Sequence, residues 1–213
     1  MIKIILVRHG YSEANKANRF CGQHDAPLDE RGRIQANEVS EYIKSTYNNI
    51  SAIYSSDLSR AYDTLLPLSE KIGVPITKDK NLREIDVGDW YGLSASEAAE
   101  KFPDSYRAYK ENPWKMRFDG GEGYADAQAR AVRSIIRIKE NHDNETVAVA
   151  THGGIIRAIV AEFSGISPEN ANEIPLISNA SVTVLCLDGE KTEFSVIGYC
   201  DYLSNKTEDS WVK

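Results

Sequence analysis

Two short segments of the chain are almost entirely apolar. Ile2–Val7 is β-branched and aliphatic apart from Lys3, and Thr146–Ala150 repeats this pattern. A strand that is apolar on both faces is typical of a parallel sheet covered by helices on both sides. We therefore predict that these two segments are buried strands of one parallel sheet.

Segments with helical spacing alternate with the strands. Apolar residues recur at the helical period over residues 31–47 and 59–72, with a short strand at Ala52–Tyr54 between them. The same period covers residues 124–140 and the stretch from 153 to about 163. Alternating strands and helices with short connections predict an α/β fold, a three-layer sandwich in which helices flank a mostly parallel central sheet.

Local signals refine this outline. Ser181–Leu187 and Glu193–Tyr199 flank an Asp-Gly pair and predict a closing β-hairpin. Ser94 and Glu97 form a capping-box pattern, so a helix is expected to begin there. Ser167-Pro168 predicts another helix start, with serine as N-cap and proline as the first helical residue.

The segment from about 88 to 123 interrupts the regular pattern. It carries two prolines and several glycines among aromatic residues such as Trp90 and Trp114. We interpret it as an inserted cap that could cover a site, within a single domain spanning residues 1–213. Residues 204–213 are expected to form a loose tail.

Composition narrows the class of protein. The 213 residues are 41% hydrophobic and 27% charged, as in an ordinary globular domain, and the net charge is −7. An acidic chain argues against nucleic-acid binding, which usually needs a basic face. Cys21, Cys186 and Cys200 lack paired or metal-ligand spacing, so reduced thiols are expected. The apolar run Ile4–Val7 is too short for a signal sequence or a membrane span. We therefore expect a cytoplasmic protein without nucleic-acid or membrane partners.

The two buried strands end in similar residues. Arg8-His9-Gly10 follows the first strand, and Thr151-His152-Gly153-Gly154 follows the second. In open α/β sheets ligands bind beyond the carboxyl ends of the strands. Arginine matches phosphoryl oxygens in a bidentate way, and glycines at a helix start let backbone N–H groups approach an anion. One histidine alone reads as a buried core residue, but two at equivalent strand ends predict a phosphate site.

Six segments resemble the histidine phosphatase superfamily, also called the phosphoglycerate mutase-like family. They are "LVRHGYSEAN", "NRFCGQHDAPLDERGRIQA", "SSDLSRAYDT", "LREIDVGDWYGLS", "DGGEGYADAQARA" and "VATHGGIIRAIVA". They occur in the family's order and span nearly the whole chain up to about Val184. The resemblance implies a phosphoglycerate mutase-like fold.

The resemblance also implies roles for site residues. His9 would be the nucleophile that forms a phosphohistidine, and His152 would donate a hydrogen bond to a phosphoryl oxygen. Arg8 and Arg60 would keep His9 unprotonated and stabilise charge on the transferred phosphoryl group. Without the family, Arg60 reads equally well as a solvated helix arginine. Glu84 would be the general acid and then the base that activates water, with a pKa raised by burial. Taken alone, it reads as a surface ion-pair residue beside its neighbouring arginine.

The remaining matches concern the substrate pocket. The resemblance implies that Asn15, Cys21 and Gly22 line it, with a cysteine where threonine is common. Gly10 and Gly153 are expected to bring backbone N–H groups to the phosphate. Tyr11 stands where relatives more often carry a small or acidic residue, and either gates the pocket or points away.

The other histidines and a metal site carry less weight. His24 and His142 match no role and are interpreted as surface histidines. A metal site built on His9 and His152 lacks a third ligand with suitable spacing, so neither a metal nor a cofactor is expected.

Three functions fit these residues. The first is a metal-independent phosphomonoesterase that hydrolyses a small organic phosphate, the second a cofactor-dependent phosphoglycerate mutase, and the third a non-catalytic protein that binds a phosphorylated ligand. The presence of both His9 and Glu84 disfavours the third. Arg107, Lys110, Lys115 and Arg117 occur singly where mutases carry adjacent arginines.

A further difference lies beside the second histidine. His152 is followed by Gly-Gly rather than by the Gly-Asn of the mutases, so we predict the phosphatase. Tyr106, Tyr109, Trp114 and Phe118 either form an apolar pocket for the leaving group or pack within the cap. The physiological substrate and the oligomeric state, a homodimer included, stay open.

Overall fold

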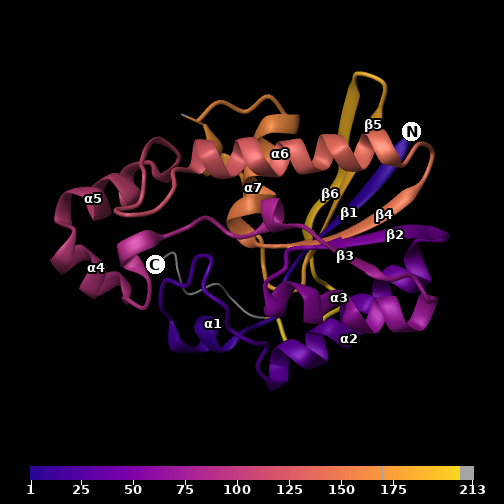
Figure 1. The fold of residues 1–213 in the computed structure, drawn as a ribbon, viewed down its shortest axis with the longest axis horizontal. Helices are drawn as coiled ribbons and strands as arrows, with labels where there is room; N and C mark the ends of the chain where they lie inside the picture. The colour runs from indigo at the N-terminus through magenta and orange to yellow at the C-terminus, as the bar shows by residue number, and fades with distance from the viewer. Residues whose placement is uncertain (169, 207–213) are drawn as a thin grey trace.

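A six-stranded sheet forms the centre of the protein. The computed structural model describes residues 1–168 and 170–206. The strand order is β3-β2-β4-β1-β5-β6 (Figure 1). The strands are β1 (Ile2–Arg8), β2 (Ile50–Ser55), β3 (Ile76–Lys78), β4 (Thr146–Thr151), β5 (Val182–Asp188) and β6 (Lys191–Tyr199). The first four are parallel, whereas β5 is antiparallel to β1 and β6 to β5. The mostly parallel sheet and the closing hairpin are therefore confirmed.

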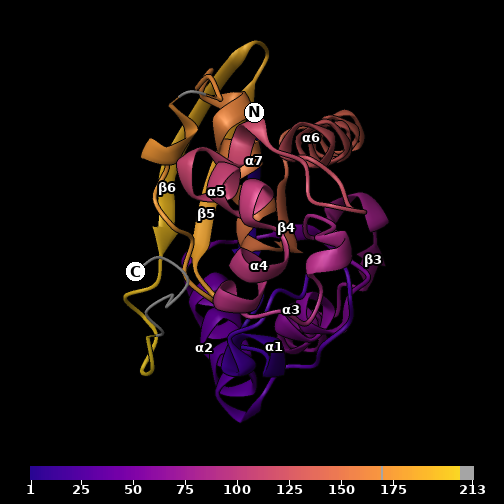
Figure 2. The same ribbon diagram turned by 90° about the vertical axis from the view of Figure 1, so that its left-hand side faces the viewer.

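Helices cover both faces of the sheet because side chains along each strand point alternately to opposite sides. From β1, Ile4 and Leu6 join one buried cluster, and Ile5 and Val7 join another. The first cluster contains residues of α6 (Tyr124–Asn141) and α7 (Gly153–Phe163), and the second contains residues of α2 (Glu30–Thr46) and α3 (Ser59–Ile72). The two helix pairs lie on opposite sides of the strands (Figures 1 and 2), which confirms the three-layer sandwich.

The irregular segment 88–123 lies at one end of the molecule, on the left in Figure 1 and facing the viewer in Figure 2. It contains α4 (Ala95–Lys101), α5 (Pro103–Glu111) and 3₁₀ turns at Gly88–Trp90 and Pro113–Lys115. The predicted capping box starts α4, since Ser94 Oγ accepts from Glu97 N and the Glu97 carboxylate accepts from Ser94 N.

Aromatic residues hold this segment against the rest of the chain. Trp90 is fully buried, and its ring contacts those of Phe20, Tyr109 and Phe118 at centroid distances of 5.2, 5.7 and 5.1 Å. Phe20 belongs to the loop that follows the short helix α1 (Glu13–Ala17). The segment therefore packs directly against the loop between β1 and α2.

The helix predicted at Ser167-Pro168 is wrong. Asn170 N donates to Ser167 O across a turn, and only a 3₁₀ turn at Ala171–Glu173 follows. Pro175 lacks the N–H that a continuing helix would need, and the described residues from 167 to 175 form no α-helix. A further 3₁₀ turn at Lys80–Leu82 leads toward Glu84.

The described part of the chain ends beside α2. Of the predicted tail, Ser204 N donates to Glu38 and Asn205 O accepts from Gln35, while residues 207–213 lie outside the described part. Within the described residues, no helix combines the length and apolar character needed to cross a membrane.

Candidate active site

The two predicted strand ends meet at one edge of the sheet. β1 and β4 are neighbours in register, with Arg8 opposite Thr151, and His9 N donates to Thr151 O at 2.9 Å. This pairing brings the His9 and His152 rings to a centroid distance of 5.1 Å. The sequence therefore located both histidines correctly at the carboxyl edge of a parallel sheet.

His9 is held in one tautomer. Its ring is buried, and Nδ1 lies 2.7 Å from Gly10 O. A carbonyl oxygen can only accept, so Nδ1 must carry the proton and Nε2 keeps its lone pair. Burial, followed by the charges of Arg60 and Arg8, lowers the pKa of His9 well below 6.5. His9 is therefore a neutral imidazole at neutral pH, with Nε2 available as a nucleophile.

His152 is completely buried. Its Nε2 lies 3.0 Å from Ser56 Oγ, and its Nδ1 has no hydrogen-bond partner among the described residues. Burial first, then the charge of Arg60, lowers its pKa well below 6.5. His152 does not line the cavity beside His9. Its predicted hydrogen bond to a phosphoryl oxygen therefore stays a prediction.

Arg8 and Arg60 place two buried guanidinium groups beside His9. Arg60 is 2% exposed and donates to Gly22 O and His24 O at 2.8 Å each. Burial is also the main cause that lowers the pKa of Arg60. Arg8 is 8% exposed and donates to Ile177 O. Arg60 is thus a buried site residue and not the solvated helix arginine that was the alternative.

The Glu84 carboxylate lies beside the first turn of α7. Its Oε2 accepts from Gly154 N at 3.2 Å, and its Oε1 accepts from Ile85 N at 2.9 Å. The neighbouring Arg83 pairs instead with Asp57, through two hydrogen bonds of 2.6 Å. Glu84 is therefore not the surface partner of Arg83 that its sequence position alone suggested. Its carboxylate faces the same cavity as His9.

The cavity has a volume of about 510 Å³. Of the predicted site residues, it is lined by Arg8, His9, Asn15, Cys21, Gly22, Arg60, Glu84 and Gly153. Gly10 is an exception, because its N–H donates to Thr64 Oγ1 at 2.9 Å. The prediction that Gly10 N–H faces the phosphate is therefore wrong. Gly10 acts through its carbonyl, which orients His9.

Asn15 and Cys21 have defined orientations. Asn15 Oδ1 accepts from Ser12 N, Ser12 Oγ and Asn179 Nδ2 at 3.1, 2.9 and 3.3 Å. With its oxygen occupied, the amide nitrogen of Asn15 is the end left to donate into the cavity. Cys21 Sγ donates to His24 O at 3.2 Å, and burial raises the pKa of this thiol. Cys21 is therefore a thiol at neutral pH.

The far side of the cavity is more apolar. Tyr109 and Phe118 line it, whereas Tyr106 and Trp114 do not. Two of the four aromatic residues therefore belong to the pocket, and the other two pack within segment 88–123. Residues of the loop from 172 to 177 also line the cavity. Arg157 and Lys110 add two cations to this apolar lining. This side can accommodate the organic part of a phosphorylated compound.

The unmatched residues also have clear positions. Tyr11 points away from the cavity, with its ring 4.4 Å from the Arg31 guanidinium carbon. His24 is exposed and stacks on Tyr91, as expected of a surface histidine. His142 is half-buried at the end of α6 and contacts Tyr54 and Glu145, so it is less exposed than His24. Among the described residues, no cluster of three or more His, Cys, Asp or Glu could hold a metal ion.

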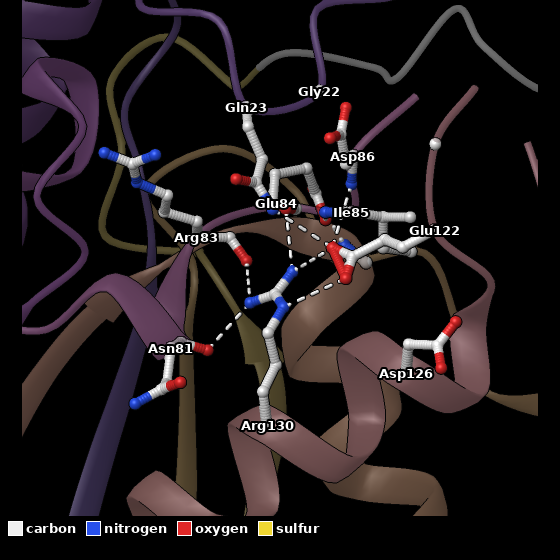
Figure 3. Close-up of polar contacts among 12 residues, drawn as sticks. Gly22, Gln23, Asn81, Arg83, Glu84, Ile85, Asp86, Glu122, Asp126 and Arg130 are labelled. Carbon is white, nitrogen blue, oxygen red and sulfur yellow. Dashed lines mark hydrogen bonds and ion pairs between the residues drawn. The ribbon is translucent and has the colours of Figure 1, made fainter. Parts of the chain in front are cut away.

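Sequence reasoning missed the residues that support the site. Asn179 Nδ2 donates to His9 O at 3.0 Å, and Thr64 binds Gly10 N, so both fix the turn that carries the nucleophile. Arg130 and Glu122 hold the backbone around Glu84 (Figure 3). These residues act mainly through backbone groups of distant segments, and their positions in the sequence carry no signal of that.

Comparisons with known proteins agree with this geometry. A family model described as "Histidine phosphatase superfamily (branch 1)" matches residues 4–199. Phosphoserine phosphatase 1 of Hydrogenobacter thermophilus is 36% identical over 166 residues, which is 78% of each chain. Phosphoglycerate mutase-like protein 4 of Arabidopsis thaliana is 35% identical over 204 residues, which is 94% of this chain and 86% of that one.

A solved structure extends the likeness to three dimensions. A mycobacterial glucosyl-3-phosphoglycerate phosphatase superposes with a TM-score of 0.84 at 30% identity. The match covers 93% of this chain and 99% of that protein. This chain therefore shares its fold with that phosphatase.

Proposed function

This chain belongs to the histidine phosphatase superfamily and is a phosphatase, and we propose that it hydrolyses a small organic phosphate through a phosphohistidine on His9, without a metal ion. The observation that carries this proposal is the 2.7 Å bond from His9 Nδ1 to Gly10 O. It leaves the Nε2 lone pair of a neutral imidazole beside two buried guanidinium groups. A nucleophile and the charge that stabilises phosphoryl transfer are thereby combined.

The first half of the reaction transfers the phosphoryl group to the protein. His9 Nε2 attacks phosphorus in line, the N–P bond forms, and the bond from phosphorus to the leaving oxygen breaks. Arg8, Arg60 and the Asn15 amide nitrogen stabilise the phosphoryl oxygens. Glu84, in its protonated form, gives its proton to the leaving oxygen, so that an alcohol departs rather than an alkoxide.

The second half returns the protein to its starting state. Glu84, now ionised, accepts a proton from a water molecule as the water oxygen attacks phosphorus. The N–P bond breaks, inorganic phosphate forms, and His9 is again neutral. We also propose that His152 uses its unpartnered Nδ1 to donate to a phosphoryl oxygen once substrate is bound. One water is consumed in each cycle.

The leaving-group side favours an organic group with a carboxylate. Gly153 and Gly154, at the start of α7, lie against the Arg8 and Glu84 side chains. Arg157 lies one helical turn, about 5.4 Å, further along the same helix. Its Nε is buried without a hydrogen-bond partner among the described residues. The names of the similar proteins, a phosphoserine phosphatase and a glucosyl-3-phosphoglycerate phosphatase, both point to substrates with such a carboxylate. We therefore propose phosphoserine-like or phosphoglycerate-like substrates.

The mutase is supported less well, although one relative carries a mutase-like name. Arg107 pairs with Asp104, and Arg117 pairs with Asp126, so both guanidinium groups are already engaged outside the cavity. Segment 88–123 contains five basic residues, and of these only Lys110 lines the cavity within the described residues. The arrangement therefore lacks the adjacent arginines expected of a mutase.

A panel of phosphorylated metabolites tests the proposal. The panel contains O-phosphoserine, 3-phosphoglycerate, glycerol 3-phosphate and 4-nitrophenyl phosphate, each with and without EDTA. A separate assay combines 2,3-bisphosphoglycerate with 3-phosphoglycerate to detect mutase activity. We expect released phosphate that is insensitive to EDTA and absent in the His9→Ala protein. 3-Phosphoglycerate should be preferred to glycerol 3-phosphate, which replaces the carboxylate with an alcohol. Isomerised product without released phosphate would support the mutase, and EDTA-sensitive hydrolysis would exclude this mechanism.

We further propose that the protein works in the cytoplasm. Its three cysteines, Cys21, Cys186 and Cys200, are all free thiols, which is typical of a reducing compartment.

A further inference from the structure

Glu84 lies in a segment without regular secondary structure. The 3₁₀ turn ends at Leu82, and residues 84–87 belong to no helix or strand. No sheet ladder therefore fixes the backbone that carries the proposed general acid. Its carboxylate is held at one end by Gly154 N, but the position of its α-carbon must be set by other contacts.

Arg130 supplies these contacts. From α6, its Nη1 donates to Asn81 O at 2.8 Å and to Arg83 O at 2.6 Å, and its Nη2 donates to Glu84 O at 2.8 Å (Figure 3). The planar guanidinium thus holds three carbonyls of one short segment at once. Lysine has a single nitrogen and cannot reproduce this geometry.

Glu122 completes the arrangement and extends it to the other side of the cavity. Its two carboxylate oxygens accept from Arg130 Nη2 at 2.6 Å and from Nε at 3.2 Å. Its Oε1 also accepts from Asp86 N at 3.0 Å and from Gln23 Nε2 at 3.1 Å (Figure 3). Gln23 follows Gly22, whose carbonyl binds Arg60. One ion pair therefore ties the segment of Glu84 to the loop that orients Arg60.

The Arg130–Glu122 ion pair is largely buried. The Arg130 and Glu122 side chains are only 12% and 16% exposed. A charge-assisted bidentate pair that is largely withdrawn from water is stronger and better ordered than an exposed one. Neither side chain lines the cavity, so both act through the residues that they hold.

We propose that Arg130 and Glu122 are positioning residues that set the Glu84 carboxyl group against the oxygen of the leaving group. This inference rests on the proposed function, in which Glu84 is the general acid. A displacement of about 1 Å can cost about 10²-fold in rate, so loss of the ion pair should weaken proton transfer without removing the nucleophile.

The test is Arg130→Lys, assayed with the best alkyl phosphate of the panel and with 4-nitrophenyl phosphate. An alkoxide leaving group needs the proton from Glu84, whereas nitrophenolate needs little help. We expect kcat/KM to fall about 10- to 100-fold for the alkyl phosphate and less than about 3-fold for the aryl phosphate. Glu122→Gln keeps the shape of the side chain but loses its charge. It should also lower the ratio of alkyl to aryl kcat/KM, by a smaller factor than Arg130→Lys.

The control is Arg137→Lys on the same helix. Arg137 pairs with Asp79, and none of the described contacts of Arg137 involves residues 83–86. The Arg137→Lys protein should therefore have the wild-type ratio of alkyl to aryl kcat/KM. In a Glu84→Gln background, Arg130→Lys should have little further effect on the alkyl phosphate, because the group that it positions has lost its proton.

Two results would overturn the inference. Equal losses on both substrates, or full additivity with Glu84→Gln, would show that Arg130 only stabilises the fold. Failure of the proposed function looks different, because wild-type protein would then hydrolyse neither substrate, or the His9→Ala protein would hydrolyse both.

Discussion

The two sides of the cavity are built from different kinds of structure. The phosphoryl side consists of residues at the ends of buried strands and in the first turns of α3 and α7, with His9 and Arg60 almost inaccessible to water. The leaving-group side consists of segment 88–123, the loop from 172 to 177 and Arg157 in the second turn of α7, and both Lys110 and Leu176 are exposed there. The difference suggests that the reaction is fixed by the sheet, whereas the choice of substrate depends on loops that can change without disturbing it.

The largest expected effect comes from the phosphoryl side. His9→Ala should lower kcat/KM by at least about 10⁴-fold for every substrate, because the proposed reaction passes through a phosphohistidine on His9. Initial rates on the alkyl and aryl phosphates measure this, with a thermal melt to show that the protein is folded. A loss confined to one substrate class would contradict the division between the two sides.

Glu84 lies where the two sides meet, so its effect should depend on the substrate. Glu84→Gln should lower kcat/KM by about 10²- to 10⁴-fold for alkyl phosphates and much less for 4-nitrophenyl phosphate. A plot of log kcat/KM against the pKa of the leaving alcohol should be steeper for this variant than for wild type. Parallel plots would mean that Glu84 has a structural role.

Arg157 tests the leaving-group side by itself. Arg157→Gln should lower kcat/KM for 3-phosphoglycerate by about 10- to 100-fold, since a hydrogen bond to a charged group contributes about 1.5–3 kcal/mol. Glycerol 3-phosphate should lose less than about 3-fold. The matched control is Arg19→Gln, because Arg19 also lines the cavity but is already bound to Glu97 and Gly92 O. Equal losses on both phosphates would remove Arg157 from substrate recognition.

The smallest expected effect is on how the free energy of unfolding depends on pH. His9 and His152 have lowered pKa values in the folded protein, so below pH 6.5 the unfolded chain binds more protons than the folded one. The full stability is therefore present above pH 6.5 and is lost as pH falls toward the lowered pKa values, by at most about 1.4 kcal/mol per pH unit for each histidine. Urea titrations between pH 7 and pH 5 measure the slope. His9→Ala should reduce it, and an unchanged slope would contradict a depressed pKa.

Much of the phosphoryl side was predictable because its signals are local. An apolar strand that ends in Arg-His-Gly determines the position of His9, and the same holds for His152 on β4. The supporting contacts were not predictable. Arg130 occupies an ordinary position for an exposed helix arginine, and its partners are backbone carbonyls about 45 to 50 residues away. Every residue has a backbone carbonyl, so the amino-acid type at a position does not indicate whether its carbonyl will accept such a hydrogen bond.

The leaving-group side was harder to predict for another reason. The aromatic residues of segment 88–123 fit either a pocket or a packed cap, and the structure divides them between both. Their roles depend on where Phe20, far away in sequence, enters the cluster. The same dependence on distant contacts explains the wrong helix at Ser167-Pro168, where a sound local start signal is followed by Pro175.

Two glycines have a consequence for sequence variation. Gly32 in the first turn of α2 touches the turn after His9, and a methyl group placed on it would lie 2.0 Å from Tyr11 O and 2.9 Å from Tyr11 C. A methyl group on Gly10 would in turn meet Gly32 O at 2.8 Å. In a saturation mutagenesis screen scored by growth or turnover, position 32 should tolerate as few replacements as the nucleophile itself, although it never meets the substrate.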